Sequence, residues 1–231
     1  MKKSKTTCLN SSKKGTLIAF EGISGCGKSE GIKNLSKYLN SIGYMPKVIE
    51  WNSNKTIRRL VNWMHSKNVL FPLLYSILQW LSFTIDYFKK IRPLLKKDEI
   101  VIVDRYFYTG LTRDKVNGSV GILGKFISHL VRKPNILILF DTAPGICYER
   151  MQYRDKALFH TNKLIKQNRL LKNKDLYYLK KLRNDYVRLL KNQKLFEDTK
   201  VFVIKDNNTD FNESIATYIT LRSFIEKERV A

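Results

Sequence analysis

Cysteine, histidine and acidic residues are scarce in this chain of 231 residues, and each scarcity argues against a class of protein. The three cysteines, Cys8, Cys26 and Cys147, are odd in number and far apart. This argues against a disulfide framework and predicts a reducing, cytoplasmic location. The three histidines have no metal-ligand spacing, which argues against a zinc enzyme. The first 14 residues are basic but contain no apolar run, so we expect a disordered basic tail and no secretory signal.

The scarcity of acids leaves a large excess of positive charge. Lysine and arginine number 43 against 20 acidic residues, which gives a net charge of +23. Such a charge attracts polyanions, whether nucleotides, nucleic acid or an anionic membrane surface. An AT-rich genome would also enrich lysine, asparagine and isoleucine, so the charge alone does not identify a partner. Apolar residues make up 43% of the chain, which is enough to build a core.

Strand-like and helix-like segments alternate along the chain, which predicts an α/β fold. The expected strands are short apolar runs at 16–21, 47–50, 100–104, 136–141 and 201–205. Apolar stripes with helical spacing run over 122–130 and 179–189. Continuous apolar runs are typical of strands that are buried on both faces. We therefore expect a five-stranded parallel sheet flanked by helices, in a single domain over residues 15–231.

Residues 69–88 are apolar and long enough to cross a bilayer. Pro72, Gln79 and Asp86 interrupt the run, and no break signal follows until Pro93. We therefore favour a water-soluble helix over 73–88 and no transmembrane span. Its apolar residues occur nearly all round, so we expect a second copy of the chain to cover one side, with Trp80 and Phe83 as anchors.

A phosphate-binding loop is the clearest motif. Gly22, Gly25, Gly27, Lys28 and Ser29 fit the pattern G-x-x-x-x-G-K-[ST], placed between a predicted strand and a predicted helix. The glycines let successive backbone N–H groups face phosphate, Lys28 reaches the β and γ oxygens, and Ser29 holds Mg²⁺. Ser24, Cys26 and Glu30 complete the expected nucleotide-binding set.

A second set of polar residues follows the third predicted strand. Asp104, Arg105 and Tyr106 lie at its carboxyl end, which faces the phosphate loop in an open parallel sheet. A carboxylate there can hold Mg²⁺, and an arginine can clamp the transferred phosphoryl group. Arg150 and Arg154 follow the fourth strand, where a helical lid over about 150–172 would begin. We expect Lys28, Arg105, Arg150 and Arg154 to be catalytic.

These residues together resemble the thymidylate kinase family of P-loop nucleoside-monophosphate kinases. The matching stretches are 20–29, 91–95 leading into 102–106, 134–141 with Glu149 and Arg150, and more weakly 182–186. The resemblance implies a P-loop kinase fold, ATP and Mg²⁺, a dimer through the helix at 73–88, and a pyrimidine monophosphate such as thymidylate as acceptor. Glu50, Arg58, Asp104, Arg105 and Tyr106 are the expected acceptor contacts.

The chain departs from the family at the acceptor. Ser24 replaces the usual aspartate, Glu30 replaces a threonine, and Ser82 and Phe83 stand where the family has an aspartate and a base-contacting arginine. These departures concern the acceptor more than the phosphate chemistry. Two alternatives stay open at this point. One is a nucleoside kinase with a hydroxyl acceptor and Glu50 as its base. The other is a nucleotide- or nucleic-acid-binding protein that has lost turnover, an alternative we do not favour.

Overall fold

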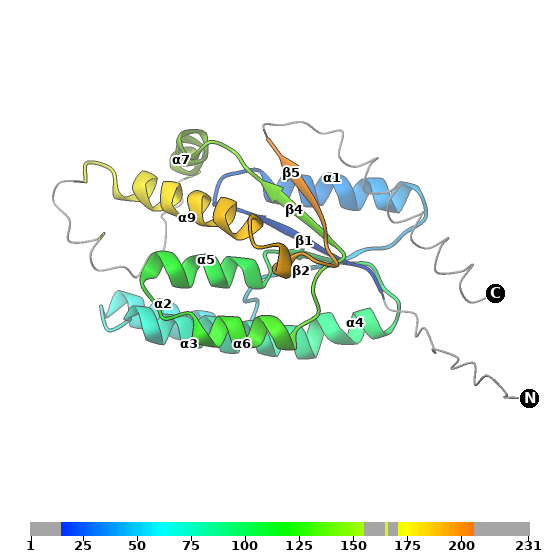
Figure 1. The fold of residues 1–231 in the computed structure, drawn as a ribbon, viewed down its shortest axis with the longest axis horizontal. Coiled ribbons are helices and arrows are strands. Elements are labelled where there is room, and N and C mark those ends of the chain that lie inside the picture. The colour runs from blue at the N-terminus through cyan, green and yellow to red at the C-terminus, as the bar shows by residue number, and fades with distance from the viewer. Residues whose placement is uncertain (1–14, 155–164, 166–170, 206–231) are drawn as a thin grey trace, which may run out of the picture.

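The computed structural model describes residues 15–154, 165 and 171–205. The predicted tail at 1–14 and most of the predicted lid at 150–172 lie outside the described residues. The ribbon forms a layered α/β structure with a central sheet (Figure 1).

All five predicted strands are confirmed, and each end lies within one residue of the expected one. The strands are β1 (Leu17–Gly22), β2 (Lys47–Glu50), β3 (Val101–Asp104), β4 (Ile136–Phe140) and β5 (Lys200–Ile204). They pair in the order β2-β3-β1-β4-β5, and every pair is parallel. Because the strands are parallel, their carboxyl ends share one edge of the sheet, where ligands bind in folds of this kind.

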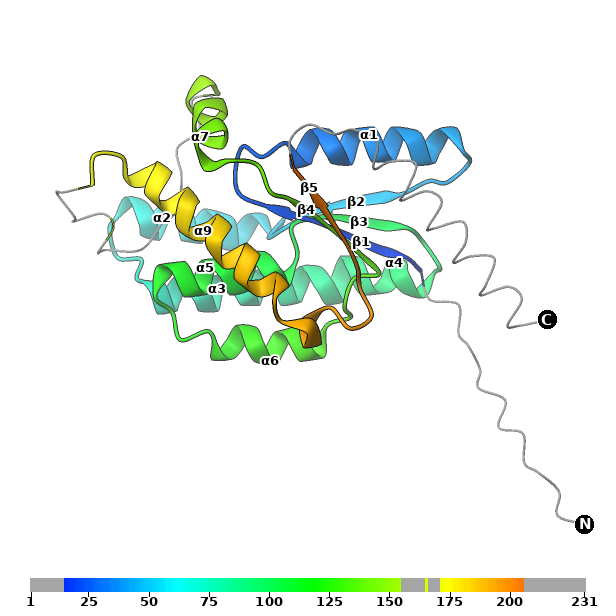
Figure 2. The same cartoon turned by 45° about the horizontal axis from the view of Figure 1, so that its top comes forward.

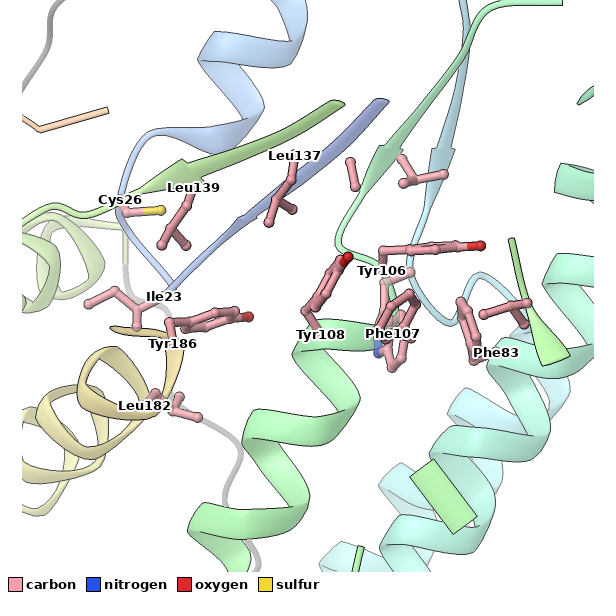
Figure 3. Packing of buried hydrophobic residues seen from close by; sticks show 14 of the residues in the cluster. Ile23, Cys26, Phe83, Tyr106, Phe107, Tyr108, Leu137, Leu139, Leu182 and Tyr186 are labelled. Carbon is pink, nitrogen blue, oxygen red and sulfur yellow. The ribbon is translucent and has the colours of Figure 1, made fainter. Parts of the chain in front are cut away.

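Alternate residues of the strands face two different helical layers. Ile18 and Phe20 of β1 pack against α1 (Lys28–Ser41), through its buried Ile32, Leu35 and Leu39. Leu17 and Ala19 belong to the larger core on the other face. That face is covered by α5 (Phe107–Asn117) and α9 (Lys174–Leu190). Figure 3 shows their side chains, Tyr106, Phe107 and Tyr108 at the start of α5 and Tyr186 from α9, facing the strands.

The remaining helices lie around this frame. They are α2 (Lys55–Ser66), α3 (Pro72–Asp86), η1 (Tyr87–Ile91), α4 (Arg92–Lys96), α6 (Ile122–Leu130), α7 (Pro144–Tyr153) and η2 (Gln193–Leu195). In Figure 2, α6 lies outermost on the side of the sheet opposite α1. Helix α2 has no fully buried residue and packs on α3 only through a small separate cluster.

The predicted helix at 73–88 is present, but it does not end at Pro93. A π-helical turn, η1, joins α3 to α4, and within it the N–H of Arg92 donates to the carbonyl of Tyr87. Proline has no N–H and its ring collides with the carbonyl four residues earlier in a regular helix. A π turn shifts the local hydrogen-bond pattern, so the helical path continues through Pro93.

Trp80 and Phe83 are not the surface anchors that the sequence predicts. Trp80 is 0% exposed and Phe83 is 2% exposed, and both pack against Trp51 inside the chain. Gly110 makes room for Trp80, because a Cβ at this position would lie 2.6 Å from the indole. Helical periodicity cannot say which side of an apolar helix faces the core when most of its positions are apolar.

A different apolar face is exposed on α3 and α6, which pack side by side. We call it the α3/α6 face. The members from α3 and η1 are Leu73, Ile77, Leu81 and Phe88, and those from α6 are Ile122, Phe126 and Leu130. The stripe predicted at 122–130 is therefore a helix as expected, but only Ile127 of its apolar residues is fully buried. Among the described residues, no helix is both long and apolar enough to span a membrane.

Candidate active site

The phosphate loop lies between β1 and α1, at the carboxyl edge of the sheet (Figure 1). Gly22, Gly25 and Gly27 have φ values of +138°, +84° and +100°. Residues other than glycine rarely adopt such positive φ angles. A Cβ at Gly25 would also collide with the carbonyl of Cys147 in α7. The loop therefore depends on glycine for its shape and for the close approach of α7.

Lys28 is folded back into the loop. Its ammonium group donates to the carbonyls of Gly22 and Ile23 at 3.1 and 2.8 Å, and to Cys26 Sγ at 3.3 Å. Burial lowers the pKa of Lys28, and the positive charge of Arg105 lowers it further. No carboxylate pairs with it in the described part of the chain. The Lys28 ammonium is therefore a buried cation without an ion-pair partner there, which favours the binding of an anionic ligand.

Arg105 lies across the start of the phosphate loop. Its guanidinium donates to the Gly22 carbonyl at 2.7 Å and to Ser24 Oγ at 3.5 Å. The backbone at Arg105 has φ +73°, in the left-handed region that costs free energy for a side chain of this size. Its N–H donates to the Phe20 carbonyl at 2.9 Å, which fixes the turn after β3.

Glu21 holds the start of α5 next to Arg105. Its Oε1 accepts from the N–H groups of Tyr106 and Thr109, at 2.8 and 3.2 Å. Its Oε2 accepts from the hydroxyls of Thr109 and Tyr186, at 2.6 and 2.9 Å. Burial raises the pKa of Glu21, whereas these hydrogen bonds and the charge of Arg105 lower it. This carboxylate caps a helix that has no capping side chain of its own.

Two cavities open at this edge. The first, the phosphate-loop cavity, has a volume of about 420 Å³. It contains much of the predicted nucleotide-binding set and both predicted lid arginines: Ser24, Gly25, Gly27, Lys28, Ser29, Glu30, Arg150 and Arg154. No ion pair within the described residues engages Arg150 or Arg154. Arg183, by contrast, forms an ion pair with Asp141 at 2.6 Å, so its charge is already neutralised within the chain.

The second, the Trp51 cavity, has a volume of about 440 Å³ and lies between β2, α2, α3 and α5. Its lining includes the predicted acceptor contacts Glu50 and Arg58, together with Trp51, Gln79 and Ser82. Glu50 and Arg58 face each other at 3.9 Å, and their side chains are 70% and 53% exposed. They form the solvent-facing rim of the cavity.

The two cavities meet at five shared residues. Ser29, Tyr75, Asp104, Arg105 and Arg113 line both. Arg113 donates to the Tyr75 hydroxyl at 3.2 Å and has no carboxylate partner among the described residues. Burial would lower the pKa of Arg113, but the surrounding phenol groups of Tyr75, Tyr178 and Tyr186 raise it. The meeting point therefore carries two guanidinium groups that form no ion pair within 4 Å of a described carboxylate.

Asp104 and Ser29 fit a magnesium site. Asp104 Oδ1 is buried without a hydrogen-bond partner, and Ser29 lies at the same junction of the cavities. In the described part of the chain, no three histidine, cysteine, aspartate or glutamate side chains lie close enough together to hold a metal ion by themselves. This donor set suits Mg²⁺, which is commonly held by one or two protein oxygens together with water and phosphate.

The structure corrects the expectation for Tyr106. Its side chain is 0% exposed and lines neither cavity. Its hydroxyl donates to the Arg132 carbonyl at 2.8 Å, and its ring contacts Phe83. Cys26 is also buried, and it contacts the ammonium of Lys28 through its sulfur. Both residues are buried next to the site, and neither lines a cavity.

Four residues of the site are not among those predicted from the sequence: Glu21, Trp51, Gln79 and Arg113. Glu21 could have been found, because it is the one charged residue in the apolar run 16–21. Arg113 carries no local signal that separates it from the other cations. It enters the site only because α5 runs along both cavities.

Comparisons with known proteins agree with this geometry. A family model described as thymidylate kinase matches residues 20–209, more than four fifths of the chain. A protein named "Probable thymidylate kinase 2" from Saccharolobus solfataricus is 33% identical over 139 residues, which cover 60% of this chain and 65% of that protein. A thymidylate kinase of Caldanaerobacter subterraneus subsp. tengcongensis is 29% identical over 191 residues, which cover 77% and 83%.

A solved structure gives the same fold. The crystal structure of thymidylate kinase from Ehrlichia chaffeensis superposes with a TM-score of 0.62 and covers 90% of this chain and 99% of that one. The sequence identity is 17%, so this likeness concerns the fold alone.

Proposed function

The chain belongs to the thymidylate kinase family, and we propose that it transfers the γ-phosphoryl group of ATP to thymidylate across the junction of the two cavities. One observation carries this proposal. The phosphate-loop cavity and the Trp51 cavity share Ser29, Tyr75, Asp104, Arg105 and Arg113. Nucleotides bound in the two cavities would therefore bring their phosphate groups together at this junction.

On the donor side, the phosphate loop binds the ATP phosphates through its backbone N–H groups and Lys28. Lys28 leaves its internal carbonyl partners and turns to the β and γ oxygens when ATP binds. Arg150 and Arg154 neutralise further phosphate charge. They lie at the start of the predicted lid, most of which falls outside the described residues.

On the acceptor side, a phosphate oxygen of the monophosphate attacks the γ-phosphorus in line with the bond to the bridging β–γ oxygen. The new P–O bond forms as that bond breaks, and ADP leaves with the electron pair. A phosphate oxygen is already nucleophilic, so positioning and charge neutralisation do most of the work. Arg105 and Arg113 hold the reacting phosphates, and Arg58 guides the acceptor from the rim.

We propose Ser29 and Asp104 as the protein ligands of Mg²⁺. The ion, when bound, neutralises charge on the β and γ phosphates. The unpaired Asp104 Oδ1 supports this assignment.

We also propose that two copies of the chain pair through the α3/α6 face. The exposed fractions of its side chains reach 52% for Leu73 on α3 and 70% for Ile122 on α6. Exposed apolar side chains that gather on neighbouring helices often mark an interaction surface. A two-fold interface would cover the same face on both copies.

The test of function is a panel of acceptors with ATP and Mg²⁺. We expect turnover with thymidylate and deoxyuridylate, and none with thymidine, because the mechanism needs a phosphate oxygen as nucleophile. Phosphorylation of thymidine without phosphorylation of thymidylate would instead establish a hydroxyl-acceptor kinase. ATP hydrolysis without any acceptor product would exclude both.

A further inference from the structure

Unpartnered polar atoms are concentrated around the Trp51 cavity. Seven buried side-chain polar atoms of the described residues have no hydrogen-bond partner. Five of these atoms belong to residues that line this cavity: Trp51 Nε1, Asn52 Oδ1, Gln79 Oε1, Ser82 Oγ and Asp104 Oδ1. A buried polar atom without a partner costs free energy, so such atoms are rare and call for an explanation. Their concentration here indicates a ligand that supplies the missing partners.

Asp114 determines which end of the Gln79 carboxamide remains without a hydrogen-bond partner. Asp114 Oδ1 accepts from Gln79 Nε2 at 2.5 Å, and Asp114 Oδ2 accepts from Trp80 Nε1 at 2.7 Å. Burial raises the pKa of Asp114, whereas the hydrogen bonds from Trp80, Ser76 and Gln79 lower it. A carboxylate that accepts from these donors faces the NH₂ end of Gln79. Gln79 Oε1 therefore remains as an acceptor, and a rotation of the amide would place two oxygens against each other.

The surroundings keep this arrangement rigid. Trp80 is 0% exposed and is enclosed by Gly110 and Gly124, where any Cβ would overlap its ring. Gln79 itself is 2% exposed. Ser82 lies one helical turn after Gln79 on the same side of α3, so both polar atoms face the same region.

The thymine base offers one N–H donor on its pairing edge, between two carbonyl acceptors. Building on the proposed function, we infer that Gln79 Oε1, oriented by Asp114, accepts the hydrogen bond from the ring N–H of the acceptor base. The indole N–H of Trp51 and the hydroxyl of Ser82 are the donors available for the two carbonyls. Gln79 and Ser82 thus take over the base contact that the resemblance assigns to an arginine at the position of Phe83, a residue that does not line the cavity.

The two residues have different roles. Gln79 touches the base and determines specificity, whereas Asp114 acts through Gln79 and is a positioning residue. In cytosine the equivalent ring nitrogen is an acceptor, so it would face Gln79 Oε1 without a proton between them. The inference therefore predicts a preference for thymidylate over deoxycytidylate that depends on Asp114.

Asp114→Asn is the decisive variant. An asparagine can still accept from Trp80, and its NH₂ group can donate to Gln79 Oε1. The Gln79 carboxamide can then turn and present an N–H to the cavity. We expect the ratio of thymidylate to deoxycytidylate, measured in both kcat/KM and Kd, to fall about tenfold or more.

Gln79→Met keeps the volume and removes the acceptor, in case Asp114→Asn folds poorly. It should weaken thymidylate about 10- to 100-fold and leave N3-methylthymidylate, which lacks the ring N–H, almost unchanged. Ser36→Ala is the matched control, because Ser36 Oγ is also buried and unpartnered but does not line the cavity. Ser36→Ala should leave the ratio of thymidylate to deoxycytidylate unchanged.

Measuring the dissociation constants together with turnover separates the two hypotheses. A wild-type chain that binds thymidylate but never phosphorylates it would refute the proposed function, while the binding ratios would still decide the role of Gln79. If Asp114→Asn and Gln79→Met lower the affinity for every nucleotide by the same factor, the inference about Gln79 is wrong.

Discussion

The phosphate-loop cavity and the Trp51 cavity adjoin each other but are built in different ways. The first is built around one contiguous loop, residues 24–30, whose three glycines set its backbone shape, and residues of other elements complete its lining. The second has no such loop and takes most of its lining from residues of β2, α2, α3, β3 and α5. Phosphate recognition needs only N–H groups and cations, whereas recognition of a base needs particular polar atoms at particular places.

This difference explains where the chain departs from the family pattern. The phosphate-loop motif is complete, while Ser82 and Phe83 replace the residues that the family uses at the acceptor. A set of side chains can be replaced one at a time if the new set meets the same ligand groups. The backbone of a loop offers no such freedom, because each glycine angle must be kept.

The largest effect should come from the phosphate-loop cavity. Lys28→Ala should lower kcat about 10³-fold, because a cation that meets the transferred phosphoryl group is lost. The substitution should not lower the free energy of unfolding. The pKa of Lys28 is lowered in the folded state, so between that value and 10.5 the unfolded chain binds more protons and wild-type stability rises with pH.

Steady-state turnover and thermal unfolding at several pH values check this prediction. Lys28→Ala should unfold at the same temperature as the wild type or higher at pH 7, and it should lack the rise in stability toward pH 10.5. Turnover at the wild-type rate in Lys28→Ala would contradict the assignment of residues 22–29 as the phosphate-binding loop.

Neighbouring residues of α3, the helix that carries Gln79 and Ser82, compare its buried side with its exposed side. Trp80 is fully buried and Leu81 is 49% exposed. Trp80→Ala should lower the free energy of unfolding by roughly 3–5 kcal/mol, because it leaves a large cavity in the core. Leu81→Asp should change the stability of the folded monomer by only about 0.5 kcal/mol, yet it should convert dimers to monomers.

Urea unfolding and analytical ultracentrifugation distinguish these outcomes. Since the stability of a dimer depends on protein concentration, both variants are compared at one concentration. A wild-type chain that sediments as a monomer at micromolar concentration would contradict pairing through the α3/α6 face.

Arg113, at the boundary of the two cavities, should give a smaller effect. Arg113→Met should raise KM for thymidylate about 10- to 100-fold and change KM for ATP much less. The Trp51 cavity has fewer cations than the phosphate-loop cavity, where Lys28, Arg150 and Arg154 remain. Arg188→Met is the control, because Arg188 pairs with Asp185 and lines neither cavity. Equal changes in both KM values would show that Arg113 serves both nucleotides alike.

The sequence by itself determined the sheet and the phosphate loop. Strands buried on both faces produce continuous apolar runs, and a loop that wraps phosphate requires glycines at a fixed spacing before Lys28. Both signals are local, so they can be read along the chain. The same holds for Asp104 and Arg105, because the end of a parallel strand lies at the ligand-binding edge.

Only the tertiary structure decided which side of α3 faces the core and which side chains line the acceptor cavity. Trp80 and Leu81 are both apolar, but adjacent residues of a helix point to different sides, and the side of Trp80 faces Gly110 and Gly124, which leave space for its ring. The roles of Glu21, Gln79 and Asp114 likewise come from contacts between segments far apart in the chain. Such contacts leave no periodic trace in the sequence, since each depends on how separate elements pack together.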